Sequence, residues 1–322
     1  MNKIVVTGCA GFIGFHLVNS LLENQENVVI GIDNLSPSYG GYWSEKRLKA
    51  IPESRRFRFE NLDLAETNVA HLSKLFDGAY AVIHLAAWPG VRNSQLKPHD
   101  YSVANLNAFG NILEAIRSGQ PRQFLFASSS SIYGDLGVSG AVKEDQATGK
   151  NLRSYYAATK WANEILAKSH QAITLIPTVA LRFFTVYGEY GRPDMAYWMF
   201  AENISRGEEV RLYGETGGSR NFTFIDDTVE ILQALLKIHH QGFEAFNIST
   251  GEPSETIKIV NELSKNLKLP AKIKVIQRPD VDVEKTWADL NKIQSYVGVT
   301  NATTLNEGIL RFSKWFLLNG TK

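Results

Sequence analysis

The stretch RSYYAATK (residues 153–160) contains two tyrosines and a lysine whose spacing could support acid–base chemistry. Tyr156 and Lys160 are four residues apart, so a helix would carry both side chains on one face. A nearby ammonium group favours the phenolate form and lowers the pKa of a tyrosine, which can then act as a general base near neutral pH. Tyr155 has Thr159 at the same offset. The spacing therefore selects Tyr156 as the candidate base, although a surface helix pair would show the same pattern.

A second stretch with chemical meaning is TGCAGFIG (residues 7–14), which carries three glycines at the spacing G-x-x-G-x-x-G. It follows a predicted strand and opens a predicted helix. Glycines allow a tight turn whose backbone N–H groups approach a pyrophosphate, and the helix N-terminus adds partial positive charge. We therefore expect a dinucleotide at this turn. The expected cofactor-binding residues here are Gly8, Gly11, Phe12, Ile13 and Gly14.

Two aspartates at predicted strand ends indicate how the dinucleotide is held. Asp33 ends the second predicted strand, near the ~20-residue offset typical of a carboxylate that binds the adenosine ribose. Such a carboxylate would repel a 2′-phosphate, so the sequence favours NAD over NADP. Asp63 follows the third predicted strand and could bind the adenine, although a turn aspartate would look the same.

The strand end HLAA (residues 84–87) carries small residues where the chain should pass the cofactor. Leu85, Ala86 and Ala87 are therefore expected to contact it. His84 could be an acid or a base, but it lies within an apolar run. We predict that it is a hydrogen-bonded core histidine instead.

The elements that must position these residues alternate between short apolar runs and longer amphipathic segments. Buried strands are predicted at 3–8, 27–33, 56–63, 81–87, 123–129 and 178–184, and helices at 12–24, 68–76, 101–119 and about 154–170. Strand–helix alternation predicts a parallel sheet covered on both faces. The expected fold class is α/β, with a Rossmann-type doubly wound parallel sheet.

The second half of the chain has a different character. Residues 188–198 and 213–227 are Gly-rich and polar with interspersed aromatics, and short helices are predicted near 228–240, 255–266 and 304–319. We therefore predict an NAD-binding Rossmann domain over residues 1–180. Residues 181–322 should form a smaller α/β domain that mainly binds the substrate, with the chain crossing between the two.

Composition limits the classes of function. The chain has 322 residues, of which 44% are hydrophobic and 21% charged, and its net charge of +1 gives no bulk attraction for nucleic acid. A single cysteine, Cys9, excludes an intramolecular disulfide and favours a reducing compartment. No stretch resembles a signal peptide or reaches the ~18 apolar residues of a membrane span. The seven histidines are scattered. We expect a cytoplasmic enzyme without a metal, a membrane or a nucleic-acid partner.

Taken in order, TGCAGFIG, HLAA, SSSSIYG (128–134) and YYAATK (155–160) resemble the extended short-chain dehydrogenase/reductase family, which modifies nucleotide sugars. The resemblance runs nearly end to end. The stretches SYYAATKWANE, LRFFTVYGEYGRPDM and SRNFTFIDD are most similar to UDP-glucuronate 4-epimerases. This resemblance implies NAD-dependent oxidation at C4 of UDP-glucuronate, followed by reduction on the opposite face to give UDP-galacturonate.

The resemblance also assigns catalytic roles. Tyr156 matches the family's base, Lys160 the lysine that also holds the nicotinamide ribose, and Ser129 the hydroxyl that relays the proton. Asn105 matches a position near the nicotinamide; a helix-surface amide is the alternative. Related dehydratases and decarboxylases carry acidic residues next to the catalytic hydroxyl, where this chain has Ser130 and Ser131. This difference favours an epimerase.

Substrate residues follow from the same resemblance. Ser130, Ser131, Thr185 and Arg192 match positions assigned to the C6 carboxylate, and an arginine fork suits a carboxylate. Arg220 and Arg278 match arginines near the UDP phosphates. Relatives pair the later arginine with an aspartate across a short gap. Here both Asp280 and Asp282 follow Arg278, so that register stays open.

Two other functions remain open from the sequence. One is a 4-epimerase of UDP-hexoses or UDP-N-acetylhexosamines, and the other is a non-catalytic NAD-binding regulator that reuses the fold. The family resemblance also implies a homodimer, in which the helices near 99–118 and 154–170 of two copies form a four-helix bundle.

Overall fold

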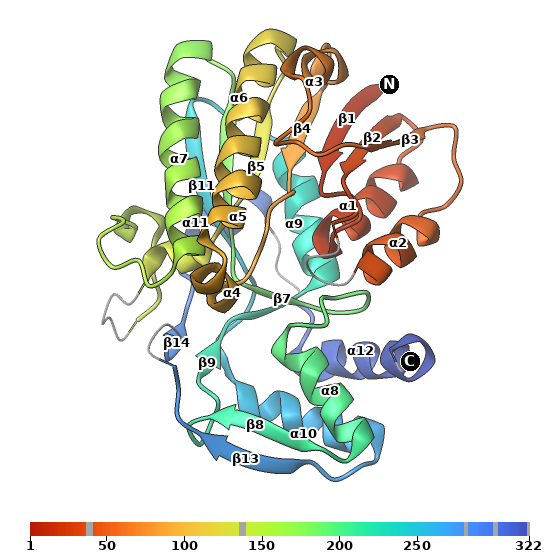
Figure 1. Cartoon of the computed structure of the whole chain (residues 1–322), viewed down its shortest axis with the longest axis vertical. Helices are drawn as coiled ribbons and strands as arrows, with labels where there is room; N and C mark the ends of the chain where they lie inside the picture. The colour runs from red at the N-terminus through yellow and green to blue at the C-terminus, as the bar shows by residue number, and fades with distance from the viewer. Residues whose placement is uncertain (37–40, 135–139, 280–282, 299–301, 321–322) are drawn as a thin grey trace.

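A seven-stranded parallel sheet forms the centre of the molecule (Figure 1). The computed structural model describes residues 1–36, 41–134, 140–279, 283–298 and 302–320. The strand order is β11-β6-β5-β4-β1-β2-β3, which confirms the doubly wound α/β class predicted from the sequence. The strands are β1 (Asn2–Thr7), β2 (Asn27–Asp33), β3 (Phe57–Asn61), β4 (Ala81–His84), β5 (Phe124–Ser129), β6 (Thr178–Phe183) and β11 (Phe243–Ile248).

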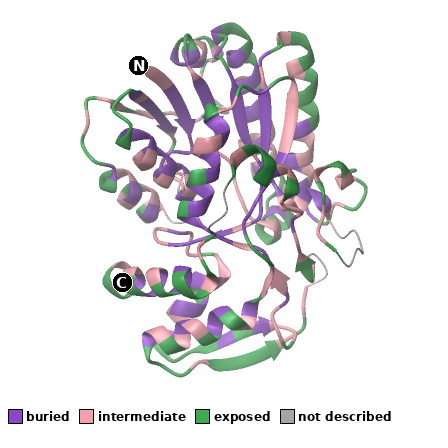
Figure 2. Cartoon of the chain, turned by 180° about the vertical axis from the view of Figure 1, so that it is seen from behind, coloured by how far each residue is buried: buried purple, intermediate pink, exposed green. Residues whose placement is uncertain are grey.

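Helices cover both faces of this sheet because its strands are apolar on both faces. In β1, Val5 packs into one core and its neighbours Ile4 and Val6 into the other, and all three are at most 2% exposed. Figure 2 shows the buried strands between the two layers. One face carries α3 (Val69–Phe76), α6 (Ala108–Gly119) and α7 (Tyr155–Thr174), and the other α1 (Phe12–Glu23), α9 (Ile225–Lys237) and α11 (Asn291–Val297).

The predicted continuous helix over residues 101–119 is wrong in detail. The chain forms α5 (Pro98–Ser102), a π-helical turn (Val103–Asn107) and then α6. A π turn holds an extra residue and is frequent at functional sites. The wider turn contains Asn105, whose side chain is buried.

A smaller set of strands and helices lies beyond the carboxyl ends of the sheet (Figure 1). Its strands are β7 (Thr185–Tyr187), β8 (Glu209–Tyr213), β9 (Ser219–Arg220), β10 (Phe222–Phe224), β12 (Ser254–Glu255), β13 (Lys272–Ile276) and β14 (Lys285–Thr286). Its helices are α8 (Ala196–Arg206), α10 (Thr256–Leu267) and α12 (Leu305–Asn319). Between them the chain returns to the large sheet, because β11 pairs with β6 and α9 packs on α1.

Residues 1–180 and 181–322 therefore do not correspond to separate sheets. The predicted division into a cofactor-binding and a substrate-binding domain stays a prediction. Within the described ranges, no helix has the length and apolar character needed to cross a membrane.

Candidate active site

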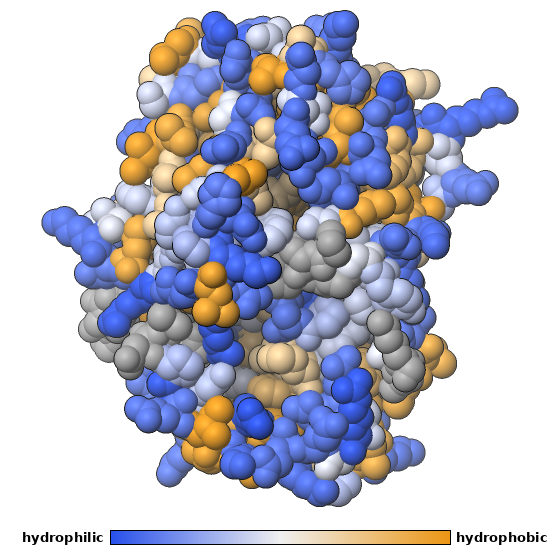
Figure 3. All heavy atoms as spheres, viewed as in Figure 1, coloured by the Kyte–Doolittle hydropathy of each residue, from blue (hydrophilic) through white to orange (hydrophobic). Residues whose placement is uncertain are grey.

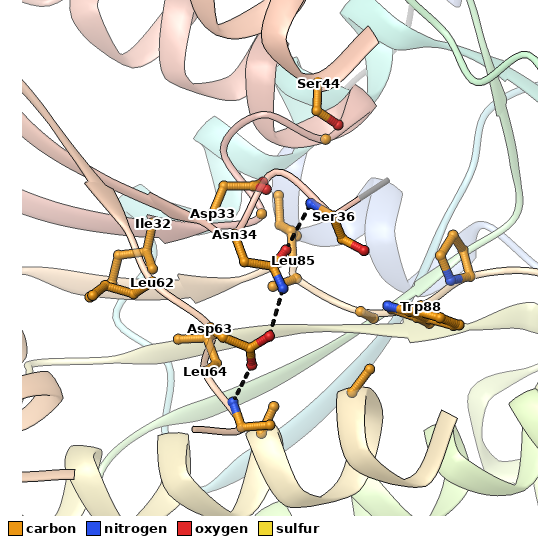
Figure 4. A pocket seen from close by; sticks show the side chains of 18 of the residues that line it. Ile32, Asp33, Asn34, Ser36, Ser44, Leu62, Asp63, Leu64, Leu85 and Trp88 are labelled. Carbon is orange, nitrogen blue, oxygen red and sulfur yellow. Dashed lines mark hydrogen bonds between the residues drawn. The ribbon is translucent and has the colours of Figure 1, made fainter. Parts of the chain in front are cut away.

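The carboxyl ends of β1, β2 and β4 border a cavity of about 560 Å³. It lies where the strand order reverses, the position at which open α/β sheets bind ligands. Figure 4 shows Asp33, Asn34 and Asp63 on one side of it and Trp88 on another. The predicted cofactor residues that line it are Gly8, Gly11, Phe12, Asp33, Asp63, Leu85, Ala86 and Ala87.

The glycine turn packs closely against the chain after β4 and against α1, which leaves no room for side chains at Gly8 and Gly14. Gly8 has a φ of +73°, and a Cβ on it would lie 2.7 Å from the backbone nitrogen of Ala86. A Cβ on Gly14 would lie 2.0 Å from the carbonyl oxygen of Gly8, so Gly14 allows α1 to pack on the turn. Gly14 and Ile13 are not among the residues that line the cavity. Gly11 caps α1 without a side chain, which keeps the helix N-terminus accessible to a ligand.

Asp33 is held in place by two backbone donors. Its Oδ2 accepts a hydrogen bond of 3.0 Å from the N–H of Ala10, and its Oδ1 accepts one of 2.9 Å from Leu35. Burial raises the pKa of Asp33 above its ordinary value. A carboxylate can accept about four hydrogen bonds, so this one retains capacity for ribose hydroxyls.

Asp63 is oriented in a similar way at the neighbouring strand end (Figure 4). Its Oδ2 accepts from Asn34 Nδ2 at 2.8 Å and its Oδ1 from the N–H of Ala65 at 2.9 Å. His84, in contrast, lies in the core, as predicted. Its Nδ1 is 2.8 Å from Thr7 Oγ1, and burial lowers its pKa to about 3, so the ring is neutral at ordinary pH.

The candidate base and its lysine lie on the first turns of α7. Ser154 caps this helix, since its side chain accepts from the N–H of Ala157 at 3.1 Å. Lys160 is 1% exposed, and its Nζ lies 5.9 Å from the centre of the Tyr156 ring. The same Nζ donates a hydrogen bond of 2.9 Å to the carbonyl of Ala127. Burial lowers the pKa of Lys160 to about 8. A buried ammonium group therefore lies beside Tyr156.

The two adjacent tyrosines have different surroundings. The hydroxyl of Tyr155 is 2.6 Å from Ser102 Oγ on α5. Tyr156 makes an edge contact with the buried Tyr101, with the ring centres 6.4 Å apart. Tyr155 thus joins α7 to the neighbouring α5, which is a packing role.

The predicted catalytic serine marks the point where β5 ends. Ser129 caps a short 3₁₀ helix, η3 (Ser130–Tyr133): its Oγ accepts from the N–H of Ser131 and donates to Ser131 Oγ, both at 3.1 Å. Ser129 is 7% exposed. The serine run is therefore an ordered turn beside β5, the strand on which Lys160 is anchored. These serines, Tyr156 and Lys160 are not among the residues lining the cavity described above.

Arg192 lines the same cavity as the glycine turn, but its guanidinium group already holds a carboxylate. Its Nε donates to Asp194 Oδ1 at 3.0 Å and its Nη2 to Asp194 Oδ2 at 2.6 Å. No pattern in the sequence indicated this partner, although it lies only two residues away. Thr185, the other residue expected beside a carboxylate, begins β7 and is half-buried.

Asn105 does not line the cavity, but its side chain makes hydrogen bonds with the backbone of Trp88. Its Oδ1 accepts from the N–H of Trp88 at 2.7 Å, and its Nδ2 donates to the carbonyl of Trp88 at 3.0 Å. The side chain is 2% exposed, so the alternative of a surface amide is wrong. Asn105 therefore holds Trp88, which does line the cavity.

The two arginines expected near the phosphates both lie close to one glycine, Gly218. A Cβ on Gly218 would be 3.2 Å from Arg220 Nη1 and 3.4 Å from Arg278 Nη2. Arg220 also donates to the carbonyls of Val283 and Glu284, at 2.6 and 2.7 Å. The aspartates whose register was open, Asp280 and Asp282, lie outside the described residues.

Two further arginines, Arg92 and Arg47, were not predicted from the sequence. Arg92, on α4 (Val91–Leu96), lies 4.6 Å from the centre of the Tyr213 ring, and Arg278 donates to the carbonyl of Tyr213 at 3.3 Å. The only signal for Arg92 was its position shortly after HLAA. Arg47, on α2 (Gly41–Ala50), is 4% exposed and lines the cavity. It donates to the carbonyls of Ala10, Tyr190 and Gly191, a link between distant segments that no local pattern indicates.

Comparison with known proteins agrees with this architecture. The NAD dependent epimerase/dehydratase family matches residues 4–249. An uncharacterized protein of Methanocaldococcus jannaschii is 40% identical, with 98% of this chain and 97% of the relative covered. A probable UDP-glucuronate 4-epimerase of Rhizobium meliloti is 32% identical, with 98% and 96% covered.

Among solved structures, UDP-glucuronic acid 4-epimerase from Bacillus cereus, in complex with UDP-glucuronic acid and NAD, superposes with a TM-score of 0.91. Its sequence is 32% identical, and the match covers 98% of this chain and 99% of that one. These matches confirm the family resemblance and the NAD cofactor that the sequence predicts. The chain belongs to the NAD dependent epimerase/dehydratase family.

Proposed function

We propose that this protein inverts C4 of UDP-glucuronate to give UDP-galacturonate. The observation that carries the proposal is the pairing of Tyr156 with the buried Lys160, anchored on the strand that ends at Ser129. This arrangement offers a base and a hydroxyl relay but no carboxylate at residues 129–131. The relatives described above, one of them solved with UDP-glucuronic acid, support the same substrate.

In the proposed reaction, the Tyr156 phenolate accepts the proton of the C4 hydroxyl, with Ser129 as the relay. Lys160 favours the phenolate because its ammonium group is close and poorly solvated. Bound NAD supplies reversible oxidation of C4, so no net redox change occurs. Inversion then requires the sugar to rotate before C4 is reduced again, with Tyr156 returning the proton.

The substrate carboxylate is assigned to hydroxyls and one arginine. Ser130, Ser131 and Thr185 would donate hydrogen bonds to it, and Arg192 would supply positive charge. Holding the carboxylate near the plane of the C4 ketone opposes loss of CO₂. Because Ser130 and Ser131 are not strong bases, elimination has no added acid–base help at these positions.

The UDP diphosphate is assigned to three arginines. Arg220 and Arg278 approach one another at Gly218, and Arg92 stacks on Tyr213, whose carbonyl accepts from Arg278. Arg278 Nη1 lies 3.4 Å from Glu284 Oε1, so a diphosphate would compete with this carboxylate for the guanidinium group.

A UDP-hexose 4-epimerase is the second candidate, and one observation favours it. Asp194 already occupies the Arg192 fork, so a neutral sugar could bind without displacing it. A uronate would instead have to compete with Asp194 for the same two N–H groups.

One experiment separates these functions. The purified protein is incubated with UDP-glucuronate or UDP-glucose, without added NAD, and the products are followed by NMR. We expect UDP-galacturonate without CO₂ from the first substrate. Turnover of UDP-glucose alone would select the second candidate. A UDP-pentose product would contradict epimerisation, and bound NAD without turnover of either sugar would favour the regulator.

The homodimer and the cytoplasmic location stay predictions. Apolar side chains on α7 support the dimer, since Ile165, Leu166 and Ile173 are 54%, 45% and 77% exposed. Figure 3 shows hydrophobic side chains among hydrophilic ones at the upper left, where α7 lies. Sedimentation of the wild type and of Leu166→Lys tests the pairing: the wild type should sediment as a dimer and the variant as a monomer.

A further inference from the structure

We infer that Arg182 is a positioning residue that fixes the serine segment, defined as residues 129–131, against the catalytic helix α7. Arg182 lies on β6 and is 4% exposed. The inference rests on the proposed function, because Tyr156, Lys160 and Ser129 are the groups to be aligned.

One side of the Arg182 guanidinium group, formed by Nε and Nη2, binds Glu164 on α7 and is called the α7 arm. Its Nε donates to Glu164 Oε1 at 3.0 Å and its Nη2 to Glu164 Oε2 at 2.8 Å. Glu164 lies one helical turn beyond Lys160 and is 4% exposed. Ser128 Oγ, next to Ser129, donates to Glu164 Oε1 at 2.5 Å. Ser128 and Arg182 are also paired neighbours on β5 and β6. Glu164 therefore joins α7 to both strands beside the candidate catalytic groups.

The remaining nitrogen of the guanidinium group, Nη1, binds Tyr133 in η3, next to the serine segment, and is called the η3 arm. Arg182 Nη1 donates to the hydroxyl of Tyr133 at 2.9 Å, and that hydroxyl donates to Asn247 Oδ1 at 2.5 Å. Tyr133 is the last residue of η3, the short helix that Ser129 caps at its start. The turn that carries Ser130 and Ser131 is thus fixed at both ends.

Because the guanidinium group of Arg182 is planar and rigid, its hydrogen bonds to Glu164 and to Tyr133 cannot change their directions independently. Both depart from one rigid fork, so Arg182 couples the position of α7 to that of η3, and its Nη1 also donates to the carbonyl of Glu144 at 2.6 Å. A buried ion pair is weak evidence for stability, because desolvation offsets much of its attraction. Alignment of reacting groups is more sensitive, since a displacement of ~1 Å can reduce a rate about a hundredfold.

The test uses two substitutions that loosen one arm each. Tyr133→Phe removes only the hydroxyl of the η3 arm, and Glu164→Gln weakens the α7 arm. Matched controls lie at the amino end of the sheet: Tyr80→Phe, whose hydroxyl donates to Leu236 at 2.9 Å, and Glu244→Gln, which is 2.8 Å from His240. All four proteins are compared with the wild type by kcat, KM, thermal midpoint and hydrogen–deuterium exchange.

We expect Tyr133→Phe to lower kcat about tenfold or more with KM within about twofold, and to speed amide exchange over residues 130–134. Glu164→Gln should lower kcat similarly. The double variant should lose less than the product of the single losses, because both act through Arg182. The controls should keep kcat within about twofold of the wild type at a similar change in thermal midpoint.

An unchanged kcat and unchanged exchange in folded Tyr133→Phe, with an active wild type, would overturn the inference. If Glu164→Gln fails to fold, Tyr133→Phe alone decides. If the wild type does not epimerise UDP-sugars, the proposed function fails. The exchange of residues 130–134 then still shows whether the Tyr133 link orders the serine segment.

Discussion

The Nζ of Lys160 donates a hydrogen bond of 2.9 Å to the backbone carbonyl of Ala127, two residues before Ser129. This contact joins the face of α7 that carries Tyr156 to the strand that carries the serine. It also places an ammonium group in a buried position, where burial lowers its pKa from 10.5 to about 8. The contact between Lys160 and Ala127 therefore aligns the candidate catalytic groups, but the burial of the ammonium group lowers the stability of the folded protein.

This cost can be measured with Lys160→Met. The lowered pKa corresponds to about 3 kcal/mol against the folded protein below pH 8, because the unfolded lysine binds its proton more tightly. The penalty is relieved as pH rises from about 8 to 10.5. We expect the variant to lose activity about a hundredfold or more but to melt at or above the wild-type temperature at pH 7.

The two melting temperatures should converge between pH 8 and pH 10.5, as seen by calorimetry. A variant that melts well below the wild type throughout this range would contradict a buried, destabilising ammonium group. Lys168→Met, at an exposed position on α7, is the matched control.

Substitution of Tyr155 and of Tyr156 by Phe should have different effects on activity and stability. Tyr156→Phe removes the proposed base, so kcat should fall about a hundredfold to ten-thousandfold. Tyr155→Phe removes only a hydrogen bond to Ser102, and should cost about 1 kcal/mol of stability with kcat within about threefold. Initial rates and urea unfolding measure both effects. A larger kcat loss in Tyr155→Phe would reverse the assignment.

Arg192 and Asp194 should have opposite effects on uronate binding. Arg192→Ala should raise the KM for UDP-glucuronate about tenfold, because a charge-assisted hydrogen bond is lost. Asp194→Asn keeps the shape of the partner but not its charge, so the arginine fork is released more easily and this KM should fall. Steady-state kinetics on UDP-glucuronate and UDP-glucose distinguish the outcomes. A rise of KM in both variants would mean that Asp194 positions Arg192 rather than competing for it.

Arg92 should affect every UDP-sugar alike. Arg92→Ala should raise the KM for UDP-glucuronate and the inhibition constant of UDP by the same factor, about tenfold, because both contain the diphosphate. The Arg192→Ala variant is the comparison, since it should leave UDP inhibition nearly unchanged. If UDP inhibits the Arg92→Ala variant as it inhibits the wild type, Arg92 does not bind the diphosphate.

Asp33 should decide which dinucleotide is kept. Asp33→Asn weakens the contacts with the N–H groups of Ala10 and Leu35 and the contacts proposed with the ribose, so NAD affinity should fall about tenfold to a hundredfold. The loss of negative charge should also reduce the preference of the protein for NAD over NADP. Calorimetric titration of the dinucleotide-free protein with both cofactors measures this. An unchanged ratio of affinities would show that Asp33 does not exclude the 2′-phosphate.

The sequence by itself determined the features that depend on neighbours along the chain. The four-residue spacing of Tyr156 and Lys160, the glycine spacing before α1 and the apolar strand runs all express local periodicity. Local backbone geometry is sufficient to specify them, so the doubly wound sheet and the strand-end position of Asp33 could be predicted. The break in the helix predicted over residues 101–119 has no such local signal. It contains Asn105, whose side chain makes hydrogen bonds with Trp88, 17 residues earlier in the chain.

Only the tertiary structure decided which distant groups share one environment. Arg182, Glu164 and Tyr133 come from a strand, a helix and a turn that are apart in sequence, and Arg92 meets Tyr213 across a much longer stretch of the chain. The pairing of Arg192 with Asp194 was close in sequence, yet its geometry depends on how the loop folds. Side-chain charges interact through space rather than along the chain, so their partners become defined only when the sheet, the helices and the loops are packed together.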